Sequence, residues 1–333
     1  MSDIHNNFID AIGNTPLIRL NGPSNETGCN ILGKAEYSNP GGSIKDRAAW
    51  AIIKDSEEKN ILRENGIIIE GTAGNTGIGL TLIGNSRGYK SIIVMPETQT
   101  REKIDILKYI GAELRLVPAK PYKDPNNFVK YSGRLAEEIS KKNNGNVLWA
   151  NQFDNVANYL GHYQTTGQEI WRQTKGKIDG FICSSGTGGT IAGVGKALKE
   201  RNKNIKICLA DPKGSALYNF IKFKELKSEG NSITEGIGSS RITANFGEAP
   251  IDDAFSVDDV DALTVIYKLI ENEGLSLGTS SGINVAGAIS LAKELGPGKT
   301  IVTMLCDKSD RYQSKLFNKD FLKEKNLPIP KWL

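Results

Sequence analysis

Short apolar runs alternate along the chain with longer stretches in which apolar residues return every three or four positions. The short runs are typical of buried strands, and the longer stretches are typical of helices packed on one face. The predicted strands lie at residues 66–70, 91–96, 113–117, 147–150, 179–183, 205–210 and 300–306. The predicted helices include residues 126–142 and 191–201, a stretch that ends near Gly88 and another that ends near Gly111.

This alternation predicts parallel sheets with helices on both faces, because parallel strands need helical crossovers. A chain of 333 residues exceeds what a single core usually supports, so we expect two three-layer α/β domains with mostly parallel sheets. Ligands of such folds bind at the carboxyl ends of the strands, where the connecting loops gather. Loops rich in Gly, Ser and Thr follow several of the predicted strands, so the pattern itself indicates where a site should lie.

Charge and composition exclude several classes of function. The formal charge is only +4 and no block of basic residues stands out, so dedicated nucleic-acid binding is not expected. No apolar run approaches membrane-spanning length, and the N-terminus lacks the pattern of a signal peptide. The two histidines, His5 and His162, are too few to favour a metal site or a catalytic triad, and we interpret His162 as structural.

The cysteines indicate a reducing compartment. The chain has four cysteines and no CxxC pair, and Cys183, Cys208 and Cys306 lie in or at the end of strand-like runs. Buried, inert thiols are the expected state of such residues. We therefore expect a cytoplasmic protein without disulfides.

The segment 39–47 reads Asn-Pro-Gly-Gly-Ser-Ile-Lys-Asp-Arg and leads from an irregular turn into a predicted helix. Ser43 followed by Asp46 matches a capping box. Lys45 would then lie in the first helical turn, where the positive end of the helix dipole disfavours a protonated amine. A neutral lysine amine is what Schiff-base formation requires. Taken alone, a surface lysine at a helix start explains this segment more simply.

Two further loops of small residues precede predicted helices and are suited to binding anions. Thr72-Ala-Gly-Asn-Thr76-Gly77 offers N–H groups and hydroxyls for a carboxylate, although a plain strand-to-helix turn would also use such residues. Gly186-Thr-Gly-Gly-Thr190 begins like a dinucleotide fingerprint, but Ile191 replaces the third Gly of that motif. The loop contains no lysine or arginine, so a monophosphate fits it better than a nucleoside triphosphate.

A fourth loop, at residues 278–285, again places small residues at the start of a helix, and Ser280 is its candidate site residue. An ordinary N-terminal cap explains this loop equally well on its own. Together the four segments supply an amine, an anion cradle, a phosphate cradle and a hydroxyl.

The order of these motifs matches a known family from Ile12 to about Tyr312. The chain resembles the fold-type II pyridoxal-phosphate enzymes, in particular the cysteine synthase (O-acetylserine sulfhydrylase) and cystathionine β-synthase group. The matching motifs lie at residues 12–17, 39–47, 74–77, 95–98, 151–155, 165–171, 186–190, 235–238 and 280–282. The resemblance implies a tryptophan synthase β-like fold and pyridoxal 5'-phosphate as the cofactor.

The resemblance also implies a role for each site residue. Lys45 would form the Schiff base, Asn75 would contact the ring oxygen of the cofactor and Ser280 would bond its pyridine nitrogen. The cofactor phosphate would bind Gly186, Thr187, Gly188, Gly189 and Thr190. The substrate carboxylate would bind Thr72, Ala73, Asn75, Thr76 and Gln152, with Gly236 in the segment that closes over the substrate.

The implied reaction is a β-replacement on a small amino acid. O-Acetyl-L-serine would lose acetate to give an aminoacrylate, and sulfide would add at Cβ to form L-cysteine. Lys45 would take the Cα proton and later return it. Ser280 cannot protonate the pyridine nitrogen as an aspartate would, so the ring is a weaker electron sink, which suits β-elimination better than transamination.

Three departures from the family pattern concern the substrate rather than the cofactor. Position 73 is Ala, where cysteine synthases usually carry Ser. Arg241 follows the motif at 235–238 in place of an apolar segment, and it could bind an anionic substrate or cofactor substituent. Residues 306–312 read Cys-Asp-Lys-Ser-Asp-Arg-Tyr, where a Pro and a Gly are more usual.

Other functions remain open at this point. An L-cysteine desulfhydrase would form the same aminoacrylate and release pyruvate, ammonia and sulfide, and partition depends on how well the site excludes water. Another nucleophile would give cystathionine or diaminopropionate. A NAD-dependent oxidoreductase would explain the alternation but not the glycine spacing. A non-catalytic binding protein would have no use for Lys45, Asn75 and Ser280 together.

The resemblance implies a division into domains and a set of partners. Residues 1–45 and 151–333 would form a large cofactor-binding domain. Residues 46–150 would form a smaller domain that rotates to close on the substrate carboxylate. Relatives are usually homodimers, and some bind the C-terminal tail of serine acetyltransferase in the active site.

Overall fold

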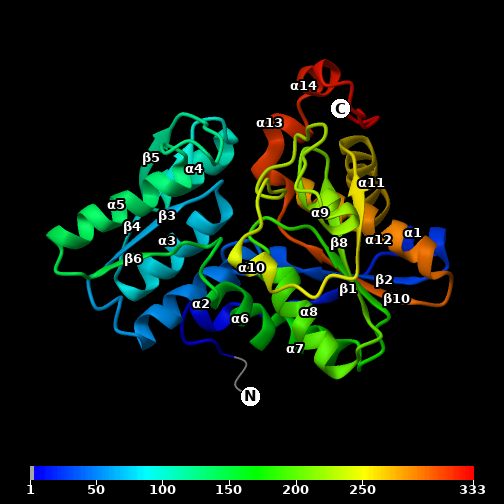
Figure 1. The fold of residues 1–333 in the computed structure, drawn as a ribbon. Helices are drawn as coiled ribbons and strands as arrows, with labels where there is room; N and C mark the ends of the chain where they lie inside the picture. Colours follow the sequence, from blue (N-terminus) through cyan, green and yellow to red (C-terminus); the bar gives the residue numbers. More distant parts are fainter. Residues whose placement is uncertain (1–3) are drawn as a thin grey trace.

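The computed structural model describes residues 4–333 and contains two open sheets, each in its own unit (Figure 1). The six-stranded sheet has the order β1-β2-β10-β7-β8-β9. Its strands are β1 (Leu17–Arg19), β2 (Asn30–Ala35), β7 (Gly180–Cys183), β8 (Lys206–Pro212), β9 (Asp253–Val257) and β10 (Thr300–Leu305). Strands β1 and β2 pair antiparallel, whereas the other pairings in this sheet are parallel.

The four-stranded sheet has the order β5-β4-β3-β6, and its pairings are parallel. Its strands are β3 (Ile67–Gly71), β4 (Lys90–Pro96), β5 (Glu113–Val117) and β6 (Val147–Trp149). One continuous stretch of chain therefore forms this sheet, while the six-stranded sheet takes strands from both sides of that stretch.

Most of the helices connect strands, and α13 and α14 follow the last strand. The helices are α1 (Asn21–Thr27), α2 (Lys45–Glu58), α3 (Asn75–Arg87), α4 (Arg101–Tyr109), α5 (Phe128–Lys142), α6 (Ala157–Gln164), α7 (Thr166–Gln173), α8 (Gly189–Arg201), α9 (Leu217–Phe223), α10 (Ala244–Gly247), α11 (Asp259–Glu273), α12 (Thr279–Leu295), α13 (Gln313–Leu316) and α14 (Lys319–Glu324). The 3-10 helices are η1 (Ile9–Ala11), η2 (Glu36–Ser38) and η3 (Ser309–Tyr312).

Each sheet is buried on both faces, as successive side chains of its strands show. In the six-stranded sheet, Ile182 packs in a cluster with residues of α12, while its neighbours Phe181 and Cys183 pack in a cluster with residues of α8. In the four-stranded sheet, Ile68 packs with residues of α2 and α3, whereas Ile69 packs with residues of α5. Burial on both faces explains why these strands appear in the sequence as continuous apolar runs.

The strands predicted from apolar runs are all present, with ends that differ by at most two residues. The sequence did not reveal β1, β2 or β9. In β2, Gly33 and Lys34 interrupt the apolar pattern. Gly33 faces Leu305 of β10, where an added Cβ would lie 2.6 Å from a methyl carbon, and Lys34 is fully buried by pairing with acids from other elements.

The structure also shows the state of the cysteines and whether membrane-spanning helices or metal-binding groups are present. Cys29, Cys183, Cys208 and Cys306 are all free, so the prediction of unpaired thiols is confirmed. Within residues 4–333, no helix has the length and apolar character needed to cross a membrane. Nowhere in that range do His, Cys, Asp and Glu side chains gather in a group able to hold a metal ion.

Four buried charged side chains tie α2 to the six-stranded unit. Arg47 of α2 donates to Glu36 and to Glu169 of α7, each over 2.7 Å, and Lys34 of β2 donates to Glu169 over 2.6 Å. Burial alone would raise the pKa of Glu169, but Arg47 and Lys34 hold that pKa at about 2. Because Arg47 lies two positions after Lys45, this network fixes the helix start that carries the candidate lysine.

Replacing Arg47 by Met should lower the free energy of unfolding by about 3–5 kcal/mol, because Glu36 and Glu169 would be left buried without their main partner. The change is measured as a shift in the urea midpoint. Arg87→Met is the matched control. Arg87 pairs with Glu57 but its side chain is 44% exposed, so a loss of about 1 kcal/mol or less is expected. Equal losses in the two variants would contradict a stabilising role for the buried network.

Candidate active site

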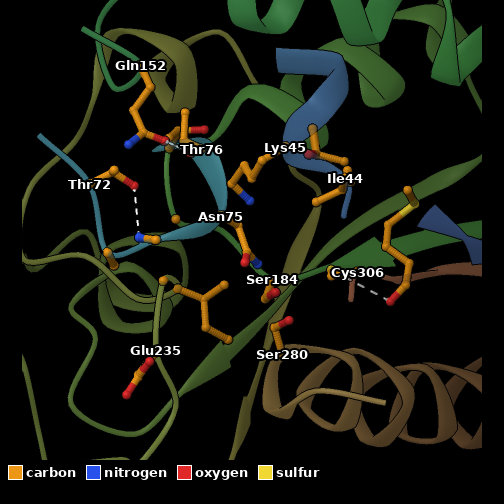
Figure 2. Close-up of a pocket in the computed structure, with 18 of the residues that line it drawn as sticks. Ile44, Lys45, Thr72, Asn75, Thr76, Gln152, Ser184, Glu235, Ser280 and Cys306 are labelled. Atoms are coloured by element: carbon orange, nitrogen blue, oxygen red, sulfur yellow. Dashed lines mark hydrogen bonds between the residues drawn. The ribbon is translucent and has the colours of Figure 1, made fainter. Parts of the chain in front are cut away.

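A pocket opens between the two units, at the carboxyl ends of strands from both sheets (Figure 2). It encloses about 800 Å³ of space, part of which is open to solvent. Twelve of the thirteen candidate residues line it, namely Lys45, Thr72, Ala73, Asn75, Thr76, Gln152, Gly186, Thr187, Gly188, Thr190, Gly236 and Ser280. The structure thus brings together four sequence segments that were each ambiguous alone.

The starts of four helices converge on this pocket. They are the starts of α2 at Lys45, α3 at Asn75, α8 at Gly189 and α12 at Thr279, and none of the four has a side-chain cap. The first N–H groups of a helix have no partner within the helix, and the helix dipole makes this end positive. The pocket wall is therefore suited to anionic groups.

Lys45 is the first residue of α2, as predicted, but the capping box is wrong. The N-terminal cap of α2 is Ile44, which has no side-chain bond to the helix. Ser43 accepts a bond from the Lys45 amide over 3.2 Å, while Asp46 turns back to accept one from the Gly41 amide over 2.6 Å. In Figure 2 the Lys45 side chain points into the pocket, toward Asn75.

The glycines of the loop 186–190 are required by close packing. A Cβ on Gly186 would lie 2.2 Å from the carbonyl oxygen of Gly236. Gly188 has a φ of +88°, and a Cβ there would lie 2.4 Å from the backbone of Phe246. The loop therefore exposes backbone rather than side chains to the pocket, which is what a phosphate cradle needs.

Hydrogen bonds from behind hold the two threonines of this loop. Asn158 donates to the Thr187 hydroxyl over 3.0 Å, and His162 lies 3.3 Å from the Thr190 hydroxyl. Burial lowers the pKa of His162 to about 3, so its ring is neutral. Gly189 is the one candidate that does not line the pocket: its amide donates to Thr187 over 3.2 Å, and its Cα packs against Asn158.

The loop 72–76 from the four-stranded unit forms the opposite wall. The Thr72 hydroxyl accepts from the Gly74 amide over 3.1 Å, and the Thr76 hydroxyl donates to Gln152 over 2.5 Å (Figure 2). Ala73 is only half-buried and lines the pocket without a polar side chain. This wall presents hydroxyls, an amide side chain and backbone N–H groups to one small volume.

Glu70 lies behind this wall and is fully buried. Burial raises the pKa of its carboxyl group to about 8, and the group interacts with Gln152. At neutral pH Glu70 is therefore uncharged. It places no negative charge beside Thr72 and Gln152, which leaves the wall suited to a carboxylate ligand.

Thirteen further residues that sequence reasoning missed also line the pocket. They are Ile44, Gly74, Lys103, Phe153, Cys183, Ser184, Ile191, Glu235, Ile237, Asn284, Met304, Cys306 and Tyr312. Position gives the signal for some of them, since Cys183, Ser184 and Cys306 lie at the ends of β7 and β10. Burial raises the pKa of the Cys306 thiol to about 11, so it stays protonated.

A buried ion pair forms the pocket wall near Gly236. Lys103 of α4 donates to Glu235 over 2.7 Å, and the other oxygen of Glu235 accepts from Lys315 over 2.6 Å. Lys103 also lies over the ring of Tyr312, 4.2 Å from its centroid. Residues this far apart in sequence carry no local signal of their pairing.

Arg241 does not offer a free cation to an anionic ligand. Its guanidinium donates to both carboxylate oxygens of Asp154, over 3.0 and 2.8 Å, and lies over the rings of Tyr122 and Phe153. Burial opposes ionisation of Asp154, but Arg241 and the Ala244 amide lower its pKa. The structure therefore contradicts the hypothesis that Arg241 binds a substrate anion.

The pocket fits a phosphorylated aldehyde. The charged residues that line it are Lys45, Lys103 and Glu235. Lys103 and Glu235 form an ion pair with each other, whereas Lys45 has no ion-pair partner among the residues that line the pocket. A phosphate would meet the uncapped start of α8 and the glycine backbone, while the aldehyde could reach the amine of Lys45. Ser280, at the start of α12, is buried and offers a hydroxyl to the same pocket.

Comparison with known proteins agrees with this fit. The family model described as "Pyridoxal-phosphate dependent enzyme" matches residues 9–307. Cysteine synthase 1 of Neurospora crassa is 50% identical over 322 residues, which cover 95% of this chain and 84% of that protein. Cysteine synthase 1 of Emericella nidulans is 48% identical over 335 residues, which cover 98% and 89%.

Among solved structures, a hydrogen sulfide-producing enzyme from Fusobacterium nucleatum matches with a TM-score of 0.82 at 34% identity, covering 94% of this chain and 99% of that one. The expected fold and cofactor are thereby confirmed. The chain belongs to the family of pyridoxal-phosphate dependent enzymes, in the group that contains the cysteine synthases.

Proposed function

We propose that this enzyme forms L-cysteine from O-acetyl-L-serine and sulfide, by replacing the β-substituent of the amino acid. One observation carries the proposal: a single pocket holds the Lys45 amine, an anion-binding wall from one unit and a glycine cradle from the other. The relatives named cysteine synthase, at 48% and 50% identity over nearly the whole chain, support this choice of substrate and product.

The cofactor would be held at its two ends and along its ring. Backbone N–H groups of the loop 186–190, other than the Gly189 amide that is bound to Thr187, and the hydroxyls of Thr187 and Thr190 would bind its phosphate. Lys45 would bind its aldehyde carbon. Asn75 would meet the ring oxygen, and Ser280 would meet the pyridine nitrogen.

The amino-acid substrate would be oriented by its carboxylate. The loop 72–76 and Gln152 would bind this carboxylate through hydroxyl, amide and backbone donors, and the neutral Glu70 behind them adds no repulsion. Gly236 also lines the pocket and is exposed, and its carbonyl oxygen lies against Gly186. Closure of the segment that contains Gly236 would exclude water from the Cβ atom of the substrate.

Lys45 would act as the base and then the acid of the reaction. When bound, the cofactor withdraws electrons from Cα, so that acetate can leave from Cβ. The Lys45 Nζ atom, once displaced by the substrate amine, would take the Cα proton and hold it while sulfide adds at Cβ. Return of this proton to Cα would complete L-cysteine. The buried and neutralised Lys103 is not placed to compete, since Glu235 holds its ammonium group.

Closure would involve the two units moving relative to one another. We propose that residues 46–150 form the smaller, mobile domain and that residues 1–45 and 151–333 form the larger one. The start of α2 would stay fixed to the larger domain through Arg47, so the motion would occur beyond it. The contacts from the start of α4 to the segment after β10 support this division, because they are polar: Thr100 donates to the Arg311 carbonyl over 3.0 Å, and the Ser314 amide donates to Glu102 over 2.7 Å. Polar contacts of this kind can form and break without exposing a core.

L-Cysteine desulfhydrase activity is the second candidate. The hydrogen sulfide-producing enzyme of Fusobacterium nucleatum shares the fold at 34% identity. Ala73 also lacks the hydroxyl that the cysteine synthase pattern has at this position. The same pocket would then take L-cysteine and release sulfide, pyruvate and ammonia.

Further proposals concern the setting of the enzyme. We propose that the enzyme is a homodimer and that the C-terminal tail of serine acetyltransferase binds in its pocket. Both proposals rest on the family resemblance alone. The cytoplasm as its compartment is supported by the free cysteines. A relative in Saccharomyces cerevisiae is named putative mitochondrial cysteine synthase, so the family resemblance does not itself fix the compartment.

Lys45→Ala should abolish the violet absorption of the purified protein and reduce cysteine formation roughly a thousandfold or more, because both the covalent link and the base are lost. Absorption spectra and initial rates measure the two effects. Lys54→Ala on the same helix is the control, since the Lys54 side chain is 56% exposed and lies outside the pocket, and it should change neither. Retained absorption in Lys45→Ala would contradict the assignment of the lysine.

Gln152→Ala should raise KM for O-acetyl-L-serine about tenfold to a hundredfold, the effect of losing one hydrogen bond to a charged group. The KM for sulfide should change far less, because sulfide has no carboxylate. The exposed Gln164 gives the control, Gln164→Ala, for which both constants should stay unchanged. Equal increases in both KM values would argue against a carboxylate site at Gln152.

The two candidate reactions are separated by offering O-acetyl-L-serine with sulfide in one assay and L-cysteine alone in another. We expect L-cysteine to be the main product of the first assay and pyruvate to be a minor product of both. Cysteine and pyruvate are quantified in parallel over the same time. If pyruvate released from L-cysteine exceeds the cysteine formed, the enzyme is a desulfhydrase and the synthase proposal fails.

A further inference from the structure

The loop after β10 differs from the usual family pattern and places a carboxylate beside the pocket. Asp307 is fully buried. One of its carboxylate oxygens accepts from the Asn75 side-chain amide over 2.7 Å and from the Tyr312 hydroxyl over 2.6 Å. Asn75 belongs to the four-stranded unit and Asp307 to the six-stranded unit, so this bond crosses the pocket between them.

Arg311 of the same loop holds the other end of the Asn75 side chain. Its guanidinium donates to the Asn75 amide oxygen over 2.6 Å and also donates to the Gly41 carbonyl oxygen. Arg311 is only 7% exposed. Both polar atoms of the Asn75 side chain are therefore bound by buried groups of one loop.

The chemistry of these two partners allows only one orientation of the amide. A carboxylate only accepts hydrogen bonds, and a guanidinium only donates them. The NH₂ group of Asn75 must therefore face Asp307, and its oxygen must face Arg311. One of the two N–H groups is used by Asp307, which leaves the second for a ligand in the pocket that Asn75 lines.

The start of α12 lies next to the Asp307 carboxylate. A Cβ on Gly278 would lie 2.2 Å from the second carboxylate oxygen, and the Gly278 amide donates to the Asp307 carbonyl over 3.0 Å. That second oxygen is buried without a hydrogen-bond partner in the described residues. The positive end of a long helix interacts favourably with a carboxylate in this position, so the start of α12 adds a second contact to the group that orients Asn75.

We infer that Asp307 and Arg311 are positioning residues, which turn the Asn75 amide so that it offers an N–H group, and not its oxygen, to the ring oxygen of the bound cofactor. The inference rests on the proposed placement of the ring oxygen against Asn75. With the amide reversed, two oxygens would face one another and repel. The pair therefore fixes a donor where the cofactor presents an acceptor.

The inference is tested with Asp307→Asn in the purified holoenzyme. An amide at position 307 can accept or donate, so the constraint from the carboxylate is lost and Arg311 alone holds the Asn75 amide. We expect the absorption maximum of the bound cofactor to shift and its dissociation constant to rise roughly tenfold to a hundredfold, the value of one hydrogen bond to a charged group. Asp310→Asn makes the same chemical change at an exposed position three residues on, and it should leave both quantities unchanged.

A double-mutant cycle separates positioning from a general structural role. If Asp307 acts through Asn75, then Asp307→Asn should change the dissociation constant of the cofactor less than twofold in an Asn75→Ala background. The same loss in both backgrounds, or an unshifted spectrum in Asp307→Asn itself, would overturn the inference. Should Asp307→Asn not fold, Arg311→Met frees the amide from its other side and should move the spectrum and the dissociation constant in the same directions.

These measurements use no amino-acid substrate and no sulfide. A changed spectrum with no cysteine formed would sink the proposed reaction and leave the inference standing. Normal cysteine formation with an unshifted spectrum in Asp307→Asn would overturn the inference and leave the proposed reaction standing.

Discussion

The starts of four helices point at one small volume, and the rest of the structure holds them there. Helices α2, α3, α8 and α12 all begin at the pocket without a side chain of the N-cap residue bonded to the helix, so their positive dipole ends face a ligand. The first amides of α2 and α8 already donate to Ser43 and Thr187, and the other unpaired N–H groups of the four first turns remain available. Uncapped helix starts cost stability unless something else satisfies them. A phosphate and a carboxylate are suited to that task, and the Lys45 amine lies among them.

The four helices belong to two different units. Contacts outside the pocket must therefore hold their starts together. The buried network of Lys34, Glu36, Arg47 and Glu169 fixes α2 to the six-stranded unit. The loop after β10 reaches across the pocket to α3 through Asp307 and Arg311. The first network lies behind the lysine and involves no ligand, whereas the second contacts a residue of the pocket itself. The first network thus stabilises the attachment of α2, whereas Asp307 and Arg311 orient a side chain of the pocket.

Local patterns predicted the central part of this architecture. Apolar runs predicted the buried parallel strands, because both faces of each sheet are covered, and loops of small residues after them predicted where ligands bind. The order of motifs then identified the family, which the comparisons confirm. The capping box at Ser43 failed because Asp46 turns back to the Gly41 amide instead of capping α2. Strand β2 was missed because a buried lysine interrupts its apolar pattern.

What the sequence could not show depends on pairs that are far apart along the chain. Arg241 looked free to bind an anion until the structure placed Asp154 against it, 87 positions away. Asn75 and Asp307 are 232 positions apart, and Lys103 and Glu235 are 132 apart. Whether a charge is available to a ligand depends on such partners, which only the fold brings together.

The central claim is that the Lys45 amine, set among these helix starts, is the group that binds the cofactor. Reduction of the holoenzyme with borohydride fixes a lysine-bound pyridoxal phosphate irreversibly, and mass spectrometry of the digested protein then locates it. The account predicts the added mass on the peptide that contains Lys45 and on no other. The added mass on Lys103 or another lysine, or its absence from a holoenzyme that still absorbs violet light, would contradict the account.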